Sequence, residues 1–265
     1  MNTIIEYSRR KQTVQEVLPV KTVWDSPHAI RYISHRGFTP LAPENSIAGF
    51  EYAGLLSQWA IETDVRMTRD GKLVCCHDAD VSRMFGADGL VAEMTWADLA
   101  GLRFCQGNRL DCLEDDRCRM PLFSEYLAVC KRYACVPFIE AKIPDVKHVL
   151  QAVKAAGFEA GGVVMSSVTK EWLLETRKHA KDMFVHWIFA REAELEDFAS
   201  LGNAGVSLNM PDAFSCTKDT IEAIHGMGLK ICLRAGDSVQ TVTHMRELGL
   251  DYIPTNCMHL RRADA

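Results

Sequence analysis

The chain has 265 residues, of which 48% are hydrophobic, and its formal net charge is −5. This hydrophobic content argues against disorder, and barrels of this length are commonly single domains. The acidic balance disfavours partners that need a basic face, such as nucleic acid or an anionic membrane. It leaves open a small anionic substrate that is held by a few local cations.

Residues 1–30 are interpreted as an N-terminal extension that precedes a single domain at 31–265. The extension is mixed and polar, lacks the apolar stretch of a signal peptide, and predicts a helix followed by a loop near Asp25. The ten cysteines follow no spacing typical of a disulfide framework or a zinc site. We therefore expect free thiols, a cytoplasmic location and no stable membrane association, while the oligomeric state is left open.

From residue 32 onward, short apolar runs alternate with helical patterns. Eight runs predict strands, at residues 32–34, 60–65, 136–140, 162–165, 184–189, 205–209, 230–233 and 252–255. Helical periodicity separates most of them, at 46–56, 145–156, 170–178, 192–201, 218–227 and 238–248. Repeated strand–helix alternation favours a parallel (β/α)8 TIM barrel. An open flavodoxin-like sheet is the alternative, but it usually has fewer strands.

Two segments interrupt this alternation. Residues 67–72 contain the turn sequence Arg69-Asp70-Gly71, and residues 73–76 then return as a strand, which predicts a β-hairpin on the end of the second strand. Residues 79–120 are rich in glycine, aspartate and charge and predict an insertion over the barrel mouth. The insertion contains five apolar side chains that could form a slot for a lipid chain: Phe85, Leu90, Trp96, Leu99 and Leu102. Alternatively, Trp96, Leu99 and Leu102 would form the buried face of a short helix.

The ends of the predicted strands hold a cluster of acidic side chains. Active sites of such barrels lie at the C-terminal ends of the strands. Glu62 and Asp64 are two residues apart on one strand and so face the same way, as do Glu140 and Lys142 on the next. Three converging carboxylates repel one another unless a cation lies between them. An all-oxygen ligand set favours Mg²⁺ or Ca²⁺ over zinc or copper.

Basic side chains at the same strand ends suit a phosphodiester. Together with a divalent cation, Arg36 and Lys142 would leave this site with an excess of about one positive charge, which matches a singly charged diester. His35 and His77 come from different strands, and a poor alkoxide leaving group needs a general acid as well as a general base. Which histidine has which role, and whether water or a substrate hydroxyl attacks, stays open.

The motifs that contain these residues form a connected pattern over residues 32–142. The pattern resembles the glycerophosphodiester phosphodiesterase family in these segments: His35-Arg36-Gly37, Pro43-Glu44-Asn45-Ser46, Glu62-Thr63-Asp64-Val65, Asp70-Gly71, His77-Asp78, Pro121-Leu122 and Glu140-Ala141-Lys142. The resemblance implies a metal-dependent barrel that hydrolyses glycerophosphodiesters to sn-glycerol 3-phosphate and an alcohol. It assigns metal binding to Glu62, Asp64 and Glu140. It assigns acid–base catalysis to His35 and His77, and phosphate binding to Arg36 and Lys142.

Other positions are assigned less directly. The resemblance gives Glu44 a supporting role behind His35 or Arg36, with the metal site as a second possibility, and Asn45 is a candidate helix cap. The family usually has tryptophan where this chain has Arg234, and Thr-Asp where it has Thr255-Asn256. Arg234 is expected either to favour an extra anionic or polyhydroxyl group on the substrate or to pair with Asp237 or Asp212.

Two further functions are compatible with this pattern. One is a lysophospholipase D-like phosphodiesterase, which would need an apolar slot beside the site. The other is a barrel that binds a phosphodiester without hydrolysing it. The presence of both histidines and all three carboxylates favours catalysis, because a degenerate binding protein usually lacks one of them.

Overall fold

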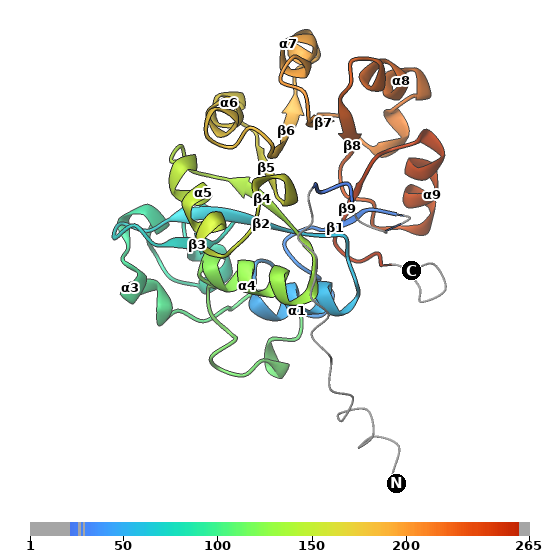
Figure 1. The fold of residues 1–265 in the computed structure, drawn as a ribbon. Helices are drawn as coiled ribbons and strands as arrows, with labels where there is room; N and C mark the ends of the chain where they lie inside the picture. The colour runs from blue at the N-terminus through green and yellow to red at the C-terminus, as the bar shows by residue number, and fades with distance from the viewer. Residues whose placement is uncertain (1–21, 26–27, 29, 260–265) are drawn as a thin grey trace.

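The computed structural model describes residues 22–25, 28 and 30–259, and its centre is a nine-stranded sheet (Figure 1). Eight strands are parallel and lie in the order β8-β7-β6-β5-β4-β2-β1-β9, and β3 pairs antiparallel with β2. Backbone hydrogen bonds from Asp251 to Ile231 (3.1 Å) and from Gly236 to Pro254 (2.8 Å) connect the two edges, so the sheet is a nearly closed barrel. The strands are β1 Tyr32–Ser34, β2 Ala60–Met67, β3 Leu73–Cys75, β4 Val136–Ala141, β5 Val164–Ser167, β6 Phe184–Ala190, β7 Ala204–Leu208, β8 Lys230–Cys232 and β9 Ile253–Thr255.

The predicted (β/α)8 barrel and the hairpin on its second strand are therefore confirmed. The helices that follow the barrel strands lie outside the sheet (Figure 1), and no helix in the described ranges is long and apolar enough to cross a membrane. These helices are α1 Ile47–Leu55, α4 Phe123–Tyr133, α5 Val146–Ala155, α6 Lys170–His179, α7 Leu195–Ala199, α8 Lys218–Gly226 and α9 Val239–Leu248.

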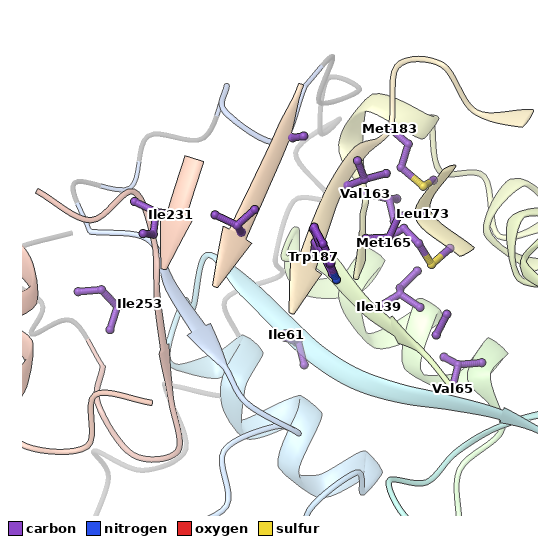
Figure 2. Packing of buried hydrophobic residues seen from close by; sticks show 14 of the residues in the cluster. Ile61, Val65, Ile139, Val163, Met165, Leu173, Met183, Trp187, Ile231 and Ile253 are labelled. Carbon is purple, nitrogen blue, oxygen red and sulfur yellow. The ribbon is translucent and has the colours of Figure 1, made fainter. Parts of the chain in front are cut away.

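The alternation of side chains along each strand separates the hydrophobic core from the interior of the barrel. Along β2, Ile61 and Val65 face outward and pack in the large cluster beneath the helices, which Figure 2 shows together with Ile139 of β4 and Trp187 of β6. Ala60 belongs instead to the cluster at the barrel floor. Because side chains on a strand alternate between faces, Glu62 and Asp64, two and four positions after Ala60, also face the barrel interior.

The insertion between β3 and α4 has a small hydrophobic core of its own. It contains α2 Ser82–Phe85, α3 Trp96–Ala100 and two 3-10 turns, Val91–Glu93 and Leu110–Cys112 (Figure 1). α3 begins beside the hairpin turn, where the Trp96 N–H donates to Asp70 Oδ1 (2.9 Å). Leu99 is fully buried in this core, against which Trp96 and Leu102 also pack. Trp96 and Leu99 therefore form the buried face of a short helix, as in the second of the two predicted arrangements, and Leu102 packs on the same core from just after the end of α3.

Two residues of the N-terminal extension close the floor of the barrel. Trp24 stacks on Trp59, with ring centroids 5.7 Å apart, and its edge contacts Phe184 at 5.0 Å. The Trp59 indole N–H donates to the Val23 carbonyl (3.1 Å), and Val23 is itself buried. The helix predicted in the preceding part of the extension lies outside the described residues.

We expect Trp24→Ala to lower the free energy of unfolding by about 1–3 kcal/mol, because it removes an aromatic side chain that packs on the barrel floor. Chemical denaturation with a fluorescence readout measures this change, and Trp24→Phe, which keeps an aromatic ring, should lose less. Equal stability of Trp24→Ala and the unsubstituted protein would show that the extension does not contribute to the barrel.

Candidate active site

Three buried carboxylates meet at the C-terminal ends of β2 and β4. Glu62, Asp64 and Glu140 each place one oxygen within 4.8 Å of the others, and no second group of this kind occurs in the described part of the chain. Asp64 is fully buried, while Glu62 and Glu140 are 5% and 9% exposed. The parallel register sets Asp64 directly beside Glu140. The structure thus brings together all three of the metal ligands predicted from the sequence.

The electrostatics of this cluster fit a hard divalent cation. Burial, followed by the charges of Asp64 and Glu140, raises the pKa of Glu62 well above its usual range. Burial and Asp64 also raise the pKa of Glu140. Oε1 of Glu62 and Oδ1 of Asp64 are buried with no hydrogen-bond partner in the structure. Carboxylate oxygens that lack a hydrogen bond and lie beside a third carboxylate are the ligands that Mg²⁺ and Ca²⁺ prefer.

Asn45 fixes the orientation of Asp64. Its amide Nδ2 donates to Asp64 Oδ2 (2.9 Å), and its Oδ1 accepts from the Thr63 hydroxyl (2.7 Å). Asn45 itself has a left-handed backbone (φ 50°), which asparagine tolerates better than most residues. The suggestion that Asn45 caps the first helix is wrong, because Ser46 is the cap and its hydroxyl accepts from Gly49 N (3.0 Å).

The two predicted phosphate ligands lie against the carboxylates. Lys142 Nζ is 2.5 Å from Glu140 Oε1 and 3.3 Å from Asp64 Oδ1. Arg36 places its Nε 3.4 Å from Asp64 Oδ2, and its backbone N–H donates to Glu62 Oε2 (2.8 Å). Although burial raises the pKa of Asp64, these two cations hold it below its usual value. Both cations also line the cavity described below.

His35 is oriented by a chain of polar groups from the loops around β8 and β9. Its Nδ1 is 2.9 Å from Asn256 Oδ1, and Asn256 Nδ2 donates to Asp237 Oδ2 (2.5 Å). A carboxylate only accepts hydrogen bonds, so the amide nitrogen must face Asp237 and the amide oxygen must face His35. Nδ1 of His35 therefore has the proton, and Nε2 keeps its lone pair. Burial, and then the charge of Arg36, lowers the pKa of His35.

His77 has a different partner, which the insertion holds in place. Its Nδ1 is 2.7 Å from Asp78 Oδ1, and Arg83 of α2 donates from Nε to Asp78 Oδ2 (2.5 Å). Arg83 Nη2 also donates to Glu44 Oε1 (2.6 Å), which in turn accepts from Arg36 Nη1 (3.1 Å). Glu44 therefore supports Arg36, one of its two expected roles, and does not belong to the carboxylate cluster.

These groups surround a cavity of about 520 Å³ at the barrel mouth. One side is polar and is lined by His35, Arg36, Glu62, His77, Glu140 and Lys142. The opposite side is formed by the ends of β5, β6 and β8 and is mainly apolar, with Arg234 at its edge. A larger surface groove of about 600 Å³ lies along α5 and contains none of these residues. The chemistry of the lining, and not its size, identifies the site.

Several residues of the site were not assigned from the sequence. In the sequence, Asn256 stands out only as a departure from the family pattern, and Asp237 only as a possible partner of Arg234. Nothing in the sequence marks Arg83 as a site residue, because its contact with Glu44 depends on how the insertion folds back onto the barrel. His186, on the cavity floor, has a pKa of about 3 because of its burial and so stays neutral.

Comparisons with known proteins agree with this geometry. A model described as the glycerophosphoryl diester phosphodiesterase family matches residues 35–256. A glycerophosphodiester phosphodiesterase of Caldanaerobacter subterraneus is 27% identical over 84% of this chain and 93% of that protein. An Oleispira antarctica phosphodiesterase, solved in complex with the product sn-glycerol-3-phosphate, superposes with a TM-score of 0.75 at 20% identity, over 85% of this chain and 92% of that chain. A glycerophosphodiester phosphodiesterase from Agrobacterium tumefaciens gives 0.70 at 22% identity, over 86% and 96%. At these identities, the two structures show a shared fold.

We expect Glu62→Gln to stabilise the metal-free protein by about 1–2 kcal/mol, or about 2–6 °C in melting temperature, because it removes one of three repelling charges. The gain should vanish at low pH, where Glu62 is protonated, and develop as the pH rises above the ordinary glutamate value of 4.5. Thermal melts with and without Mg²⁺ or Ca²⁺ measure it, with the exposed Glu171→Gln as control. The same variant should lose the metal-induced rise in melting temperature; a rise that persists would exclude Glu62 as a ligand.

Proposed function

Because this chain belongs to the glycerophosphoryl diester phosphodiesterase family and is an enzyme of that type, we propose that it hydrolyses glycerophosphodiesters to sn-glycerol 3-phosphate and an alcohol with the help of one Mg²⁺ or Ca²⁺ ion. The observation that supports this most is the set of three buried carboxylates that lies beside two histidines on the polar side of one cavity. The product bound to the Oleispira antarctica phosphodiesterase of the same fold supports the choice of product.

Glu62, Asp64 and Glu140 would hold the ion. A bound divalent cation would polarise a phosphoryl oxygen and offset the charge of the carboxylates. Arg36 and Lys142 would then turn from these carboxylates toward the non-bridging oxygens of the phosphate. Arg36 suits this role because Glu44, outside the cluster, holds its guanidinium at the cavity wall, and a guanidinium binds phosphate oxygens through paired hydrogen bonds.

The partners of the two histidines suggest how their roles divide. His35 contacts a neutral amide and keeps a free lone pair on Nε2, so it acts as the general base and takes the proton of the attacking hydroxyl, from water or from the substrate's glycerol. His77 contacts the carboxylate of Asp78, which can pair with a protonated imidazole. His77 therefore acts as the general acid and gives its proton to the leaving alcohol oxygen.

The two alternative functions receive less support. Phe85 and Leu99, two of the five side chains that a lipid slot in the insertion would use, are buried in the insertion's own core. A non-catalytic binding protein would not need both histidines to be held by separate polar partners, as they are here.

Activity should depend on a divalent metal. We expect removal of metal by EDTA, and Asp64→Asn in the presence of metal, each to reduce kcat/KM on a glycerophosphodiester by about 100-fold or more. Adding Mg²⁺ or Ca²⁺ back should restore only the unsubstituted protein. Asp88→Asn, at an exposed position of the insertion, serves as control. Full activity of the metal-free protein would refute the metal assignment.

The role of His35 can be tested through its partner. The lowered pKa of His35 places the acid limb of the kcat/KM profile below pH 6.5, because a general base must be unprotonated. Exchanging the two partners, in Asp237→Asn/Asn256→Asp, puts a carboxylate on His35 at constant net charge. The adjacent charge should raise the pKa of His35 and shift the acid limb upward by about one pH unit. His35→Ala should lower turnover by about 100-fold. An unmoved acid limb in the double variant would assign that limb to another group.

A further inference from the structure

We propose that Phe189 and Arg234 form the subsite for the alcohol half of the substrate, and that this pair selects neutral or anionic alcohols over quaternary ammonium alcohols such as choline. The inference rests on the proposed function and specifies its substrate class. Both residues line the same cavity as His35, His77 and the acidic cluster, on its opposite side.

The backbone holds the Phe189 ring at the cavity rim. Phe189 lies near the end of β6, where the register with β7 shifts between Trp187 and Ala190, and it has a left-handed backbone (φ 56°). This conformation is unfavourable for a bulky side chain. A hydrogen bond from the Phe189 backbone N–H to the Ser207 hydroxyl (3.3 Å) helps to hold it. The ring is 40% exposed. A strained residue that presents an apolar ring to a catalytic cavity indicates a binding role.

Arg234 covers a face of this ring. Its guanidinium carbon lies 5.6 Å from the centroid of Phe189, and it forms no ion pair with any carboxylate of the described ranges. The expected partners are engaged elsewhere, since Asp237 accepts from Thr255 and Asn256, and Asp212 accepts from Ser215. The expectation that Arg234 pairs with either aspartate is therefore wrong. Its N–H groups are available to a substrate.

The stacked pair determines which alcohol groups can bind. Quaternary ammonium ions bind to the faces of aromatic rings, but the Arg234 guanidinium already covers a face of Phe189 and would repel a second cation. A guanidinium donates hydrogen bonds to hydroxyl or carboxylate oxygens. Val168, which is 50% exposed, together with Ile188 and Leu233, provides an apolar wall for the carbon chain of the alcohol. Glycerol and carboxylated alcohols offer oxygens to the guanidinium and a carbon chain to the apolar wall. The choline head offers a carbon chain but places a cation against the guanidinium.

The test compares kcat/KM for glycerophosphoglycerol and glycerophosphocholine with the metal-loaded, full-length protein. The unsubstituted protein should favour glycerophosphoglycerol. Arg234→Met keeps an unbranched side chain without the charge, and should shift the ratio of the two constants toward glycerophosphocholine by about 10-fold. Adding Phe189→Leu to Arg234→Met should reverse that gain, because the uncovered ring is what would bind the ammonium group. Arg191→Met is the matched control, because it removes the same charge at a position only two residues after Phe189. Arg191 pairs with Glu194 and does not line the cavity, so this variant should leave the ratio unchanged.

An unchanged ratio in Arg234→Met, or an equal shift in Arg191→Met, would overturn the proposed subsite. A gain on glycerophosphocholine that survives Phe189→Leu would also overturn it, because the ring would then not be the binding surface. These outcomes differ from failure of the proposed function, in which the metal-loaded, unsubstituted protein would hydrolyse neither substrate.

Discussion

The mutual repulsion of three buried carboxylates is the constraint on which the rest of the site depends. Glu62, Asp64 and Glu140 lie within 4.8 Å of one another at the barrel mouth, where little water can screen their charges. Asn45, which has a left-handed backbone, holds Asp64. Arg36 and Lys142 both contact the same carboxylate. Two carboxylate oxygens remain without a hydrogen-bond partner. The arrangement becomes intelligible when a divalent cation is included.

The barrel separates stability from chemistry along its axis. At the floor, Trp24, Trp59 and Phe184 pack against one another and close the N-terminal end. At the mouth, the same barrel ends in charged and polar side chains whose burial opposes folding and which we propose bind the phosphodiester. One strand combines both regions, because Ala60 lies at the floor while Glu62 and Asp64 follow on the same face.

The sequence predicted the features that depend on local periodicity and missed those that depend on tertiary contacts. Alternation along β2 and β4 was sufficient to place Glu62, Asp64 and Glu140 together. The contact between His35 and Asn256 joins residues 221 positions apart, and Arg83 reaches Glu44, 39 positions away, only because the insertion folds back onto the barrel. Neither leaves a periodic signal. Local preference was also misleading at Asn45, since its side chain binds Asp64 and does not cap a helix.

Calorimetric titration of Mg²⁺ or Ca²⁺ into the metal-free protein, in buffers of different ionisation enthalpy, tests the central claim most directly. We predict one ion per chain, with release of protons that increases as the pH is lowered, because the ion displaces the proton that burial favours on Glu62. Asp64→Asn should abolish this binding. Binding that is absent at millimolar metal, or that persists in Asp64→Asn, would contradict the assignment of the acidic cluster as the metal site.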